Sequence, residues 1–241
     1  MKKYAIAIGL LCFLFSVHSC SESAPASTPK EELMDIAEMR SVNDSIVADI
    51  KKKVKTGDLV LRTGRDFSSE QVKDMSKEDK TYSHGGIVVI ENDSILVYHV
   101  EPDFYYKKDK VRKELIDSFI SIDHNSGFGL ARFDLSEKEV GTFVNYMETQ
   151  FQNKVAFDMT FDLKTNDKMY CSEMITKGLR TSTDGRIQIE IQRLTDKSKF
   201  KIIKQYFKVP EKRFVNMEII PIDRLYLNPA CTLLNRYTYN Q

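Results

Sequence analysis

Apolar residues recur along much of this chain at the spacing of one face of a helix. The clearest stretch is residues 140–151, where apolar positions three and four residues apart follow the capping box formed by Ser136 and Glu139. The same period predicts further helices over residues 31–55, 111–121 and 170–179. The longest segments of the chain are therefore expected to pack one apolar face against a core.

Other segments show the composition and alternation of strands. Residues 83–90 and 95–100 are rich in β-branched and aromatic residues, and Asn92-Asp93 between them is a turn signal. Shorter strands are predicted over residues 59–61, 130–133 and 186–191. The order of elements predicts an α+β fold, with a small antiparallel sheet packed against helices. Both strands of the hairpin are apolar on both faces, so we expect the sheet to be covered on each side.

The predicted hairpin brings two histidines together. If the turn has two or four residues around Asn92-Asp93, the numbers of cross-strand partners sum to 185, so Gly86 faces His99. Because side chains alternate with a period of two, His84, His99 and Glu101 then project from one face. His84 and His99 become diagonal neighbours whose rings are close enough to touch. A three-residue loop would instead place His99 on the opposite face.

The first residues have the pattern of a secretory signal peptide. Lys2 and Lys3 precede an apolar run over residues 5–17, which is too short for a transmembrane helix. Cys20 follows a small residue, as in the lipobox of bacterial lipoproteins. We therefore expect residues 1–19 to be a lipoprotein-type signal peptide cleaved before Cys20, with lipid on the Cys20 sulfur. The alternative is plain secretion with cleavage near Ser19.

The remaining chain divides into a tether and one domain. Residues 20–30 contain small polar residues and prolines, which is typical of a flexible linker. Residues 31–241 are long enough for a single domain with a substantial core. We expect the protein to lie outside the cytoplasm, held to a membrane of the cell envelope by its lipid.

The overall composition is that of a globular protein without a strong charge. The 241 residues are 41% hydrophobic and 29% charged, and the formal net charge is +1. Nucleic-acid-binding domains usually carry a clear basic excess, so no nucleic-acid partner is expected.

Cys171 is the candidate nucleophile. It lies near the start of the predicted helix 170–179, where the helix dipole is expected to lower the pKa of its thiol. If this helix packs on the face of the hairpin that carries His84, a thiol, a base and an orienting imidazole lie together. There are three alternatives. Cys171 and the two histidines are unrelated core residues, or Cys171 forms a disulfide with Cys231, or His84, His99 and Cys171 bind zinc. Because the usual zinc-ligand spacings are absent, we expect neither a metal ion nor another cofactor.

Three segments together resemble one family of enzymes. They are residues 56–60 (TGDLV), 82–88 (YSHGGIV) and 170–174 (YCSEM), and residues 157–162 (FDMTFD) add an aromatic-Asp segment. Their order is similar to that of the YiiX/YebB-like branch of the NlpC-type, papain-like cysteine hydrolases. In that branch the strand with the histidine precedes the helix with the cysteine, which is a circular permutation of the usual order.

The resemblance implies a fold and a set of roles. The fold is a permuted papain-like one, with Cys171 as nucleophile, His84 as base and His99 as the orienting residue. Glu101 is the alternative for the third role, since the matching strand of the family often ends in Glu. Three further candidates are Tyr82 or Tyr170 as an oxyanion donor and Asp58 as a ligand for a substrate amine; each is also compatible with a structural role.

The activity implied is that of a thiol hydrolase in the cell envelope. The first hypothesis is an amidase or peptidase that acts on peptidoglycan-type peptides or related amides through an acyl-enzyme. A second is a lipid-directed acyl hydrolase or acyltransferase, which a broad apolar groove beside Cys171 would favour. A third is a non-catalytic module that binds a component of the envelope.

Overall fold

The structure is a computed structural model that describes residues 29–102, 109–195, 204, 207, 209 and 217–239. Contacts within the chain divide it into two units, Met1–Glu38 and Met39–Gln241. The description below concerns the second unit. The predicted signal peptide, Cys20 and all but the last two residues of the tether lie outside the described residues, so these remain predictions.

The helices of the described residues match most of those predicted. They are α1 Pro29–Lys53, α2 Phe67–Met75, α3 Ile116–Phe119, α4 Glu137–Gln152, α5 Cys171–Ser182 and α8 Asp223–Tyr226. The capping box predicted for α4 is present, with Ser136 and Glu139 each bonded to the other's backbone. No helix among the described residues is both long and apolar enough to cross a bilayer.

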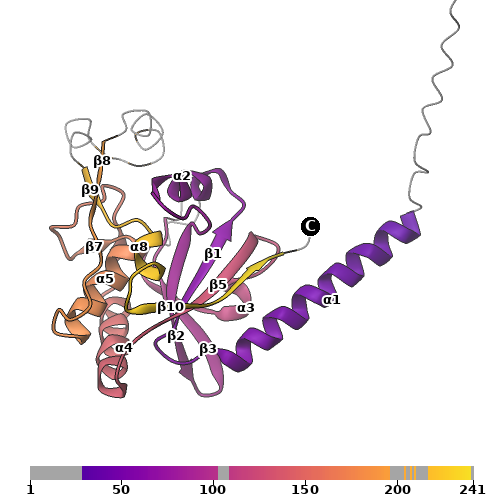
Figure 1. Cartoon of the computed structure of the whole chain (residues 1–241), viewed down its shortest axis with the longest axis horizontal. Coiled ribbons are helices and arrows are strands. Elements are labelled where there is room, and N and C mark those ends of the chain that lie inside the picture. Colours follow the sequence, from indigo (N-terminus) through magenta and orange to yellow (C-terminus); the bar gives the residue numbers. More distant parts are fainter. Residues whose placement is uncertain are drawn as a thin grey trace, which may run out of the picture. The chain divides into compact units, whose positions relative to one another are not determined.

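The strands form one large antiparallel sheet and two small ones (Figure 1). The large sheet has the order β10-β5-β1-β2-β3-β4, and its central hairpin is β2 and β3. The strands are β1 Leu59–Gly64, β2 His84–Glu91, β3 Ser94–His99, β4 Arg112–Leu115, β5 Asn125–Phe133, β6 Ala156–Phe157, β7 Lys168–Met169, β8 Gln192–Leu194, β9 Met217–Ile219 and β10 Cys231–Thr238. The pairing of Val88 with Val97 confirms the predicted hairpin register.

Apolar side chains cover both faces of the large sheet, as predicted from the hairpin. On one face Ile87 and Val89 belong to a cluster that also contains buried residues of α4 and α5. On the other face Val88 and Val97 pack in a second cluster with Phe119 of α3. The fold is thus α+β, with a central antiparallel sheet between helical layers.

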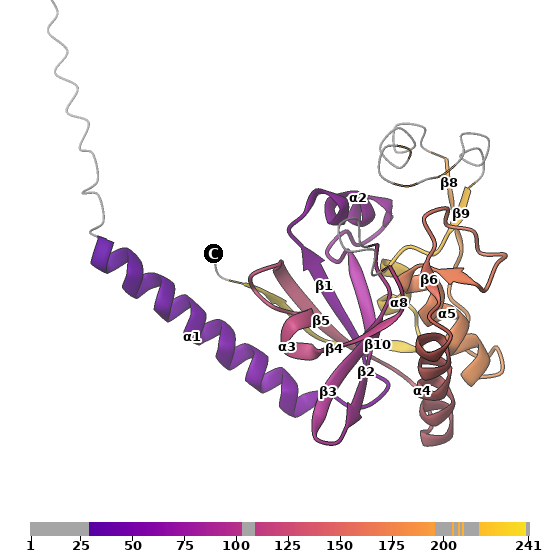
Figure 2. The same ribbon diagram turned by 180° about the vertical axis from the view of Figure 1, so that it is seen from behind.

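Helices α4 and α5 lie side by side against the first of these faces (Figure 2). Gly178 makes their close approach possible, since a Cβ at this position would lie 2.6 Å from Phe143 of α4. Met174, Ile175 and Leu179 present the buried stripe of α5 to the sheet. This packing fixes the position of the first residue of α5, Cys171.

Two local predictions were wrong. Residues 111–121 are not one helix, because Arg112–Leu115 pairs with β3 as an edge strand and the helix α3 begins only at Ile116. Residues 186–191 alternate in polarity but pair with no strand of the described chain; the pairing begins at Gln192 in β8. Strand β5 begins earlier than predicted, and β10 was not predicted.

Candidate active site

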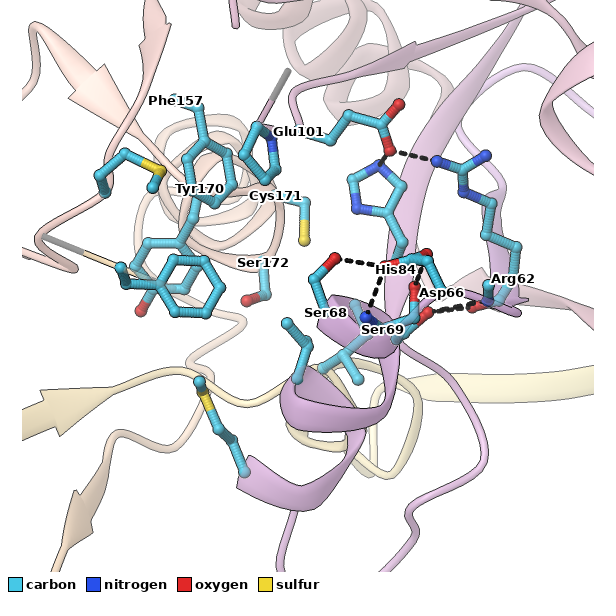
Figure 3. A pocket seen from close by; sticks show the side chains of 18 of the residues that line it. Arg62, Asp66, Ser68, Ser69, His84, Glu101, Phe157, Tyr170, Cys171 and Ser172 are labelled. Atoms are coloured by element: carbon cyan, nitrogen blue, oxygen red, sulfur yellow. Dashed lines mark hydrogen bonds and ion pairs between the residues drawn. The ribbon is translucent and has the colours of Figure 1, made fainter. Parts of the chain in front are cut away.

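Cys171 and His84 lie at one cavity, together with Glu101 (Figure 3). Cys171 is the first residue of α5 and His84 the first residue of β2, so each sits where its element begins. The cavity has a volume of about 1330 Å³. His99, the last residue of β3, is fully buried and its ring contacts that of His84.

The thiol reaches this cavity from the face of the sheet opposite to the histidines. Helix α5 packs on the face that carries Ile87, whereas the His84 and His99 rings contact Phe119 in the cluster on the other face. The condition stated from the sequence, that this helix packs on the face carrying His84, is therefore not met. Because His84 is at the end of β2, the start of α5 still comes beside it, and the Gly85 N–H approaches the Cys171 sulfur.

The two histidines and Glu114 form a continuous hydrogen-bonded chain. His84 Nε2 lies 3.0 Å from His99 Nδ1, and His99 Nε2 lies 2.8 Å from Glu114 Oε2. Nearby charges and the hydrogen bond from His99 lower the pKa of Glu114 despite its partial burial, so this carboxylate only accepts hydrogen bonds.

This chain determines which nitrogen atoms carry hydrogen. Both Glu114, which only accepts, and Arg112 Nε, which only donates and lies 3.3 Å away, contact His99 Nε2. The Glu114 contact is the shorter, at 2.8 Å, and the guanidinium is also paired with Glu101, so we take His99 Nε2 to carry the hydrogen and His99 Nδ1 to be an acceptor. His84 Nε2 must then donate to it, which leaves the lone pair on His84 Nδ1. That atom is on the side of the ring facing Cys171 (Figure 3). The described structure has no hydrogen bond between the thiol and this ring, and such bonds often close only when substrate binds.

An ionic cluster surrounds the histidines. The Glu101 carboxylate pairs with the guanidinium groups of Arg62 and Arg112, one on each oxygen. Glu101 Oε2 lies 3.8 Å from His84 Nε2, which is farther than His99 Nδ1 at 3.0 Å. His99 is therefore nearer than Glu101 to the His84 ring, and Glu101 is held by the two arginines.

Burial keeps both imidazoles neutral. It lowers the pKa of His84 well below its usual value, and the positive charge of Arg62 adds to this effect. Burial also lowers the pKa of His99, against the opposing hydrogen bond to Glu114. For Glu101, burial acts to raise the pKa, but its proximity to the His84 imidazole and the positive charges of Arg62 and Arg112 bring it to about 2.

The thiol of Cys171 is also neutral, which corrects the expectation from the helix dipole. Burial raises its pKa to about 11, although the N–H groups of Gly85 and Ser172 act in the opposite direction. The loss of solvation outweighs the helix terminus because Cys171 is only 7% exposed. The site therefore contains a neutral thiol beside a neutral imidazole.

The two tyrosines considered as oxyanion donors differ in their position relative to the cavity. Tyr170 lines the cavity, but its hydroxyl accepts a hydrogen bond from the Ile220 N–H at 2.8 Å. Tyr82 is fully buried outside the cavity lining and packs edge-on against Tyr226. It is therefore not placed to donate to an oxyanion at Cys171.

The structure supports neither the role suggested for Asp58 nor the alternative of a disulfide between Cys171 and Cys231. The Asp58 carboxylate is buried outside the cavity and pairs with Arg132 at 2.6 and 2.8 Å, so it is not placed to bind a substrate amine. Cys171 and Cys231 are both free thiols.

Sequence reasoning missed Arg62, Arg112 and Glu114. Arg62 pairs with His84 in neighbouring strands, and Arg112 pairs with His99. Their roles depend on the order β1-β2-β3-β4 in the sheet, which the hairpin pattern alone does not reveal. Because residues 111–121 were predicted to form a helix, the strand β4 that carries Arg112 and Glu114 was not predicted.

Three side chains of the cluster could in principle be metal ligands. One atom each of His84, His99 and Glu101 lie within 4.8 Å of one another. The arrangement does not fit a cation, however, because both Glu101 oxygens are paired with guanidinium groups and the two histidines bond to each other. A divalent ion would have to displace these partners against two nearby positive charges.

Comparison with solved structures shows a similarity in fold. No family model matches the chain, and no curated protein matches its sequence. Among solved structures, a protein described as "metalloprotein yiiX from Escherichia coli O157:H7, DUF1105" superposes with a TM-score of 0.62 at 17% sequence identity. The match covers 76% of this chain and 98% of that one. The chain therefore has a YiiX-like fold.

Proposed function

We propose that this protein is a thiol hydrolase of the permuted NlpC-type, papain-like class, with Cys171 as nucleophile, His84 as base and His99 as its orienting partner. The observation that carries the proposal is the chain from Glu114 through both histidines, which leaves an acceptor nitrogen of His84 directed at a thiol. The YiiX-like fold supports it, because the sequence motifs resemble that branch of the class.

The reaction begins with a neutral pair. As the Cys171 sulfur attacks the carbonyl carbon, His84 Nδ1 takes the thiol proton and a carbon–sulfur bond forms. The oxyanion lies at the start of α5, where backbone N–H groups have no acceptor within the helix. His84 then gives its proton to the leaving amine or alcohol as that bond breaks, which produces the acyl-enzyme.

Water completes the cycle at the same two residues. His84 removes a proton from water as its oxygen attacks the acyl carbon, and the carbon–sulfur bond breaks. The proton returns to the sulfur, so Cys171 and His84 regain their neutral forms. During both steps His99 accepts from His84 Nε2 and stabilises the ring that transiently becomes positive.

The proposal is tested by the kinetics of ester hydrolysis. Purified protein mixed with excess p-nitrophenyl acetate should release a burst of p-nitrophenol and then turn over more slowly. The Cys171→Ala variant should lose both phases, whereas Cys231→Ala, which removes the other described thiol, should keep them. Turnover by Cys171→Ala at the wild-type rate would refute the role of this thiol.

The location of the activity is part of the same proposal. A signal peptide over residues 1–19 and a lipidated Cys20 would hold the hydrolase at the cell envelope, where peptide amides and acyl lipids both occur. Metabolic labelling with a fatty acid tests this. Label should enter the wild-type chain and be absent from a Cys20→Ala chain.

Metal binding is the second candidate. The cluster of His84, His99 and Glu101 and the description of the YiiX-like neighbour as a metalloprotein favour it. The pairing of Glu101 with two arginines argues against it in this chain.

A further inference from the structure

One short stretch of the chain, residues 220–226, borders the space between the thiol and the imidazole. Ile220 and Ile222 line the cavity that Cys171 and His84 share. The stretch follows β9 and ends with the helix α8. Its contacts with α5 on one side and with the sheet on the other therefore bear on how the thiol and the imidazole are aligned.

On the thiol side, the two neighbours of Cys171 hold a single residue of this stretch. The Ile220 N–H donates to the Tyr170 hydroxyl at 2.8 Å, and the Ser172 hydroxyl donates to the Ile220 carbonyl at 2.5 Å. All three residues are buried, so water does not compete for these bonds. The two bonds fix the backbone of Ile220 relative to the first turn of α5.

On the imidazole side, α8 holds the loop that leads to His84. One oxygen of the fully buried Asp223 carboxylate accepts from the N–H groups of residues 77–79 in turn, at 3.2, 3.0 and 3.3 Å. The Tyr226 hydroxyl adds a bond of 3.1 Å to the carbonyl of the last of these residues. Because hydrogen bonds to a charged acceptor are stronger than those between neutral groups, Asp223 is the main attachment of α8 to this loop.

The same stretch also touches the chain on each side of His84. The Tyr226 ring packs edge-on against that of Tyr82, with 5.3 Å between ring centres. The Ile222 side chain lies close to Gly85, where an added Cβ would come within 3.1 Å of it. One stretch of the chain thus contacts the residues on both sides of the thiol and on both sides of the imidazole.

We infer, resting on the proposed function, that residues 220–226 form a clamp that aligns Cys171 with His84, and that Asp223 is the positioning residue that anchors it. The packing of α5 on the sheet is apolar and therefore non-directional, whereas the hydrogen bonds of the clamp have fixed directions. Transfer of the thiol proton to His84 Nδ1 requires hydrogen-bond contact, so a small shift between the two elements slows the reaction steeply.

Weakening the clamp at either end tests the inference. In Asp223→Asn the amide oxygen still accepts, but the charge that strengthens the bonds to residues 77–79 is lost. The rate of the burst with p-nitrophenyl acetate should fall about tenfold, while the ester concentration that gives half of the maximal rate changes less than about twofold. Ser172→Ala, which removes the bond to the Ile220 carbonyl, should give the same pattern. Asp134→Asn, at an exposed position outside the cavity, should behave as the wild type.

A double-mutant cycle with His84 separates alignment from general stability. At pH 10 a fraction of the Cys171 thiol ionises without a base, because its pKa is about 11, and this fraction can react in the His84→Ala variant. If Asp223 acts by aligning the two residues, Asp223→Asn should have no further effect in the His84→Ala background. Alkylation of Cys171 by iodoacetamide at pH 10 needs no imidazole and should also be unchanged by Asp223→Asn. A merely structural role would alter both measurements.

The outcomes distinguish this inference from the proposed function. A burst that depends on Cys171 but is unchanged in Asp223→Asn and Ser172→Ala would overturn the clamp and leave the hydrolase intact. The same relative loss from Asp223→Asn with and without His84 would overturn the clamp as well. If Asp223→Asn does not fold, Ser172→Ala decides through the same cycle with His84→Ala. Absence of a Cys171-dependent burst in the wild type would refute the hydrolase and the inference with it.

Discussion

His99 lies between His84 and Glu114, with its Nδ1 3.0 Å from the Nε2 of His84. Its other nitrogen is 2.8 Å from the Glu114 carboxylate, a charged acceptor, and 3.3 Å from Arg112 Nε, a charged donor, and the shorter contact is the one to the carboxylate. The direction of both bonds follows from that carboxylate. As a result, a residue without contact to Cys171 determines that the free lone pair of His84 is on the nitrogen facing the thiol.

The first prediction concerns Glu114. Glu114→Gln should lower kcat/KM about ten- to a hundredfold, because an amide can present either a donor or an acceptor to His99 and no longer fixes the tautomer. Since the effect is on the protonation of His84 rather than on substrate binding, kcat should fall more than KM changes. Glu137→Gln, on the exposed start of α4, is the matched control. An equal loss in both variants would contradict the role assigned to Glu114.

The second prediction is the pH dependence. The reactive form has a protonated thiol and a neutral imidazole, and it is lost when His84 gains a proton or Cys171 loses one. Because the pKa of His84 is lowered and that of Cys171 is raised to about 11, kcat/KM should stay level from about pH 6.5 to about pH 9.5. A thiolate–imidazolium pair would instead lose activity above about pH 8.5.

Alkylation of the free protein also distinguishes a neutral thiol–imidazole pair from a thiolate–imidazolium pair. Iodoacetamide reacts with thiolates, so modification of Cys171 should be slow at pH 7 and should increase about tenfold per pH unit up to about pH 10. Peptide mapping identifies the modified cysteine. Rapid modification that is independent of pH between 6 and 8 would show that the thiolate already exists in the free protein.

The third prediction is that Glu173→Gln stabilises the protein at alkaline pH. Burial raises the pKa of Glu173 to about 7, in spite of its ion pair with Lys177. A carboxyl group with a raised pKa contributes stability below its unfolded pKa and loses that contribution as the pH rises through its folded pKa. The gain in the free energy of unfolding should therefore be about 2 kcal/mol larger at pH 8 than at pH 5.

Denaturant unfolding of both proteins at the two pH values measures this difference. Glutamine keeps an oxygen that can accept from the Tyr170 N–H, so the start of α5 is retained. The Glu137→Gln control should show no such pH-dependent gain. A Glu173→Gln variant that is less stable than the wild type at pH 8 would mean that the ion pair with Lys177 outweighs the burial of the charge.

The fourth prediction concerns metals. Protein equilibrated with zinc and then dialysed should retain much less than one equivalent, and chelators should leave ester hydrolysis unchanged, because Arg62 and Arg112 occupy the Glu101 oxygens. Elemental analysis measures the metal content. Retention of one zinc per chain, lost in both His84→Ala and Glu101→Gln, would establish the metal site instead.

The sequence was sufficient for the parts of the site that depend on local periodicity. The placement of His84 and His99 as diagonal neighbours on one face followed from the turn at Asn92-Asp93 and the two-residue period of strands, and the structure has that register. The helix beginning at Cys171 followed from its apolar spacing. Both features are set within short segments, where pattern and structure are closely linked.

The remaining parts depend on which elements meet in space. Residues 112–115 have the composition of a polar helix, yet they form a strand because β3 offers them a free edge. The pKa of Cys171 could not be predicted from its helix position, since the burial that raises it comes from packing around the whole cavity. The lining of the cavity likewise depends on residues from β1, β4, α5 and the loop at Phe161.

The most direct test of the central claim is mass spectrometry of the covalent intermediate. Protein mixed briefly with p-nitrophenyl acetate and quenched in acid should carry one acetyl group, and peptide mapping should place it on Cys171. The group should be absent from Cys171→Ala and should remain in Cys231→Ala. Ester hydrolysis without any acyl group on Cys171, or with the group on another residue, would contradict the proposal.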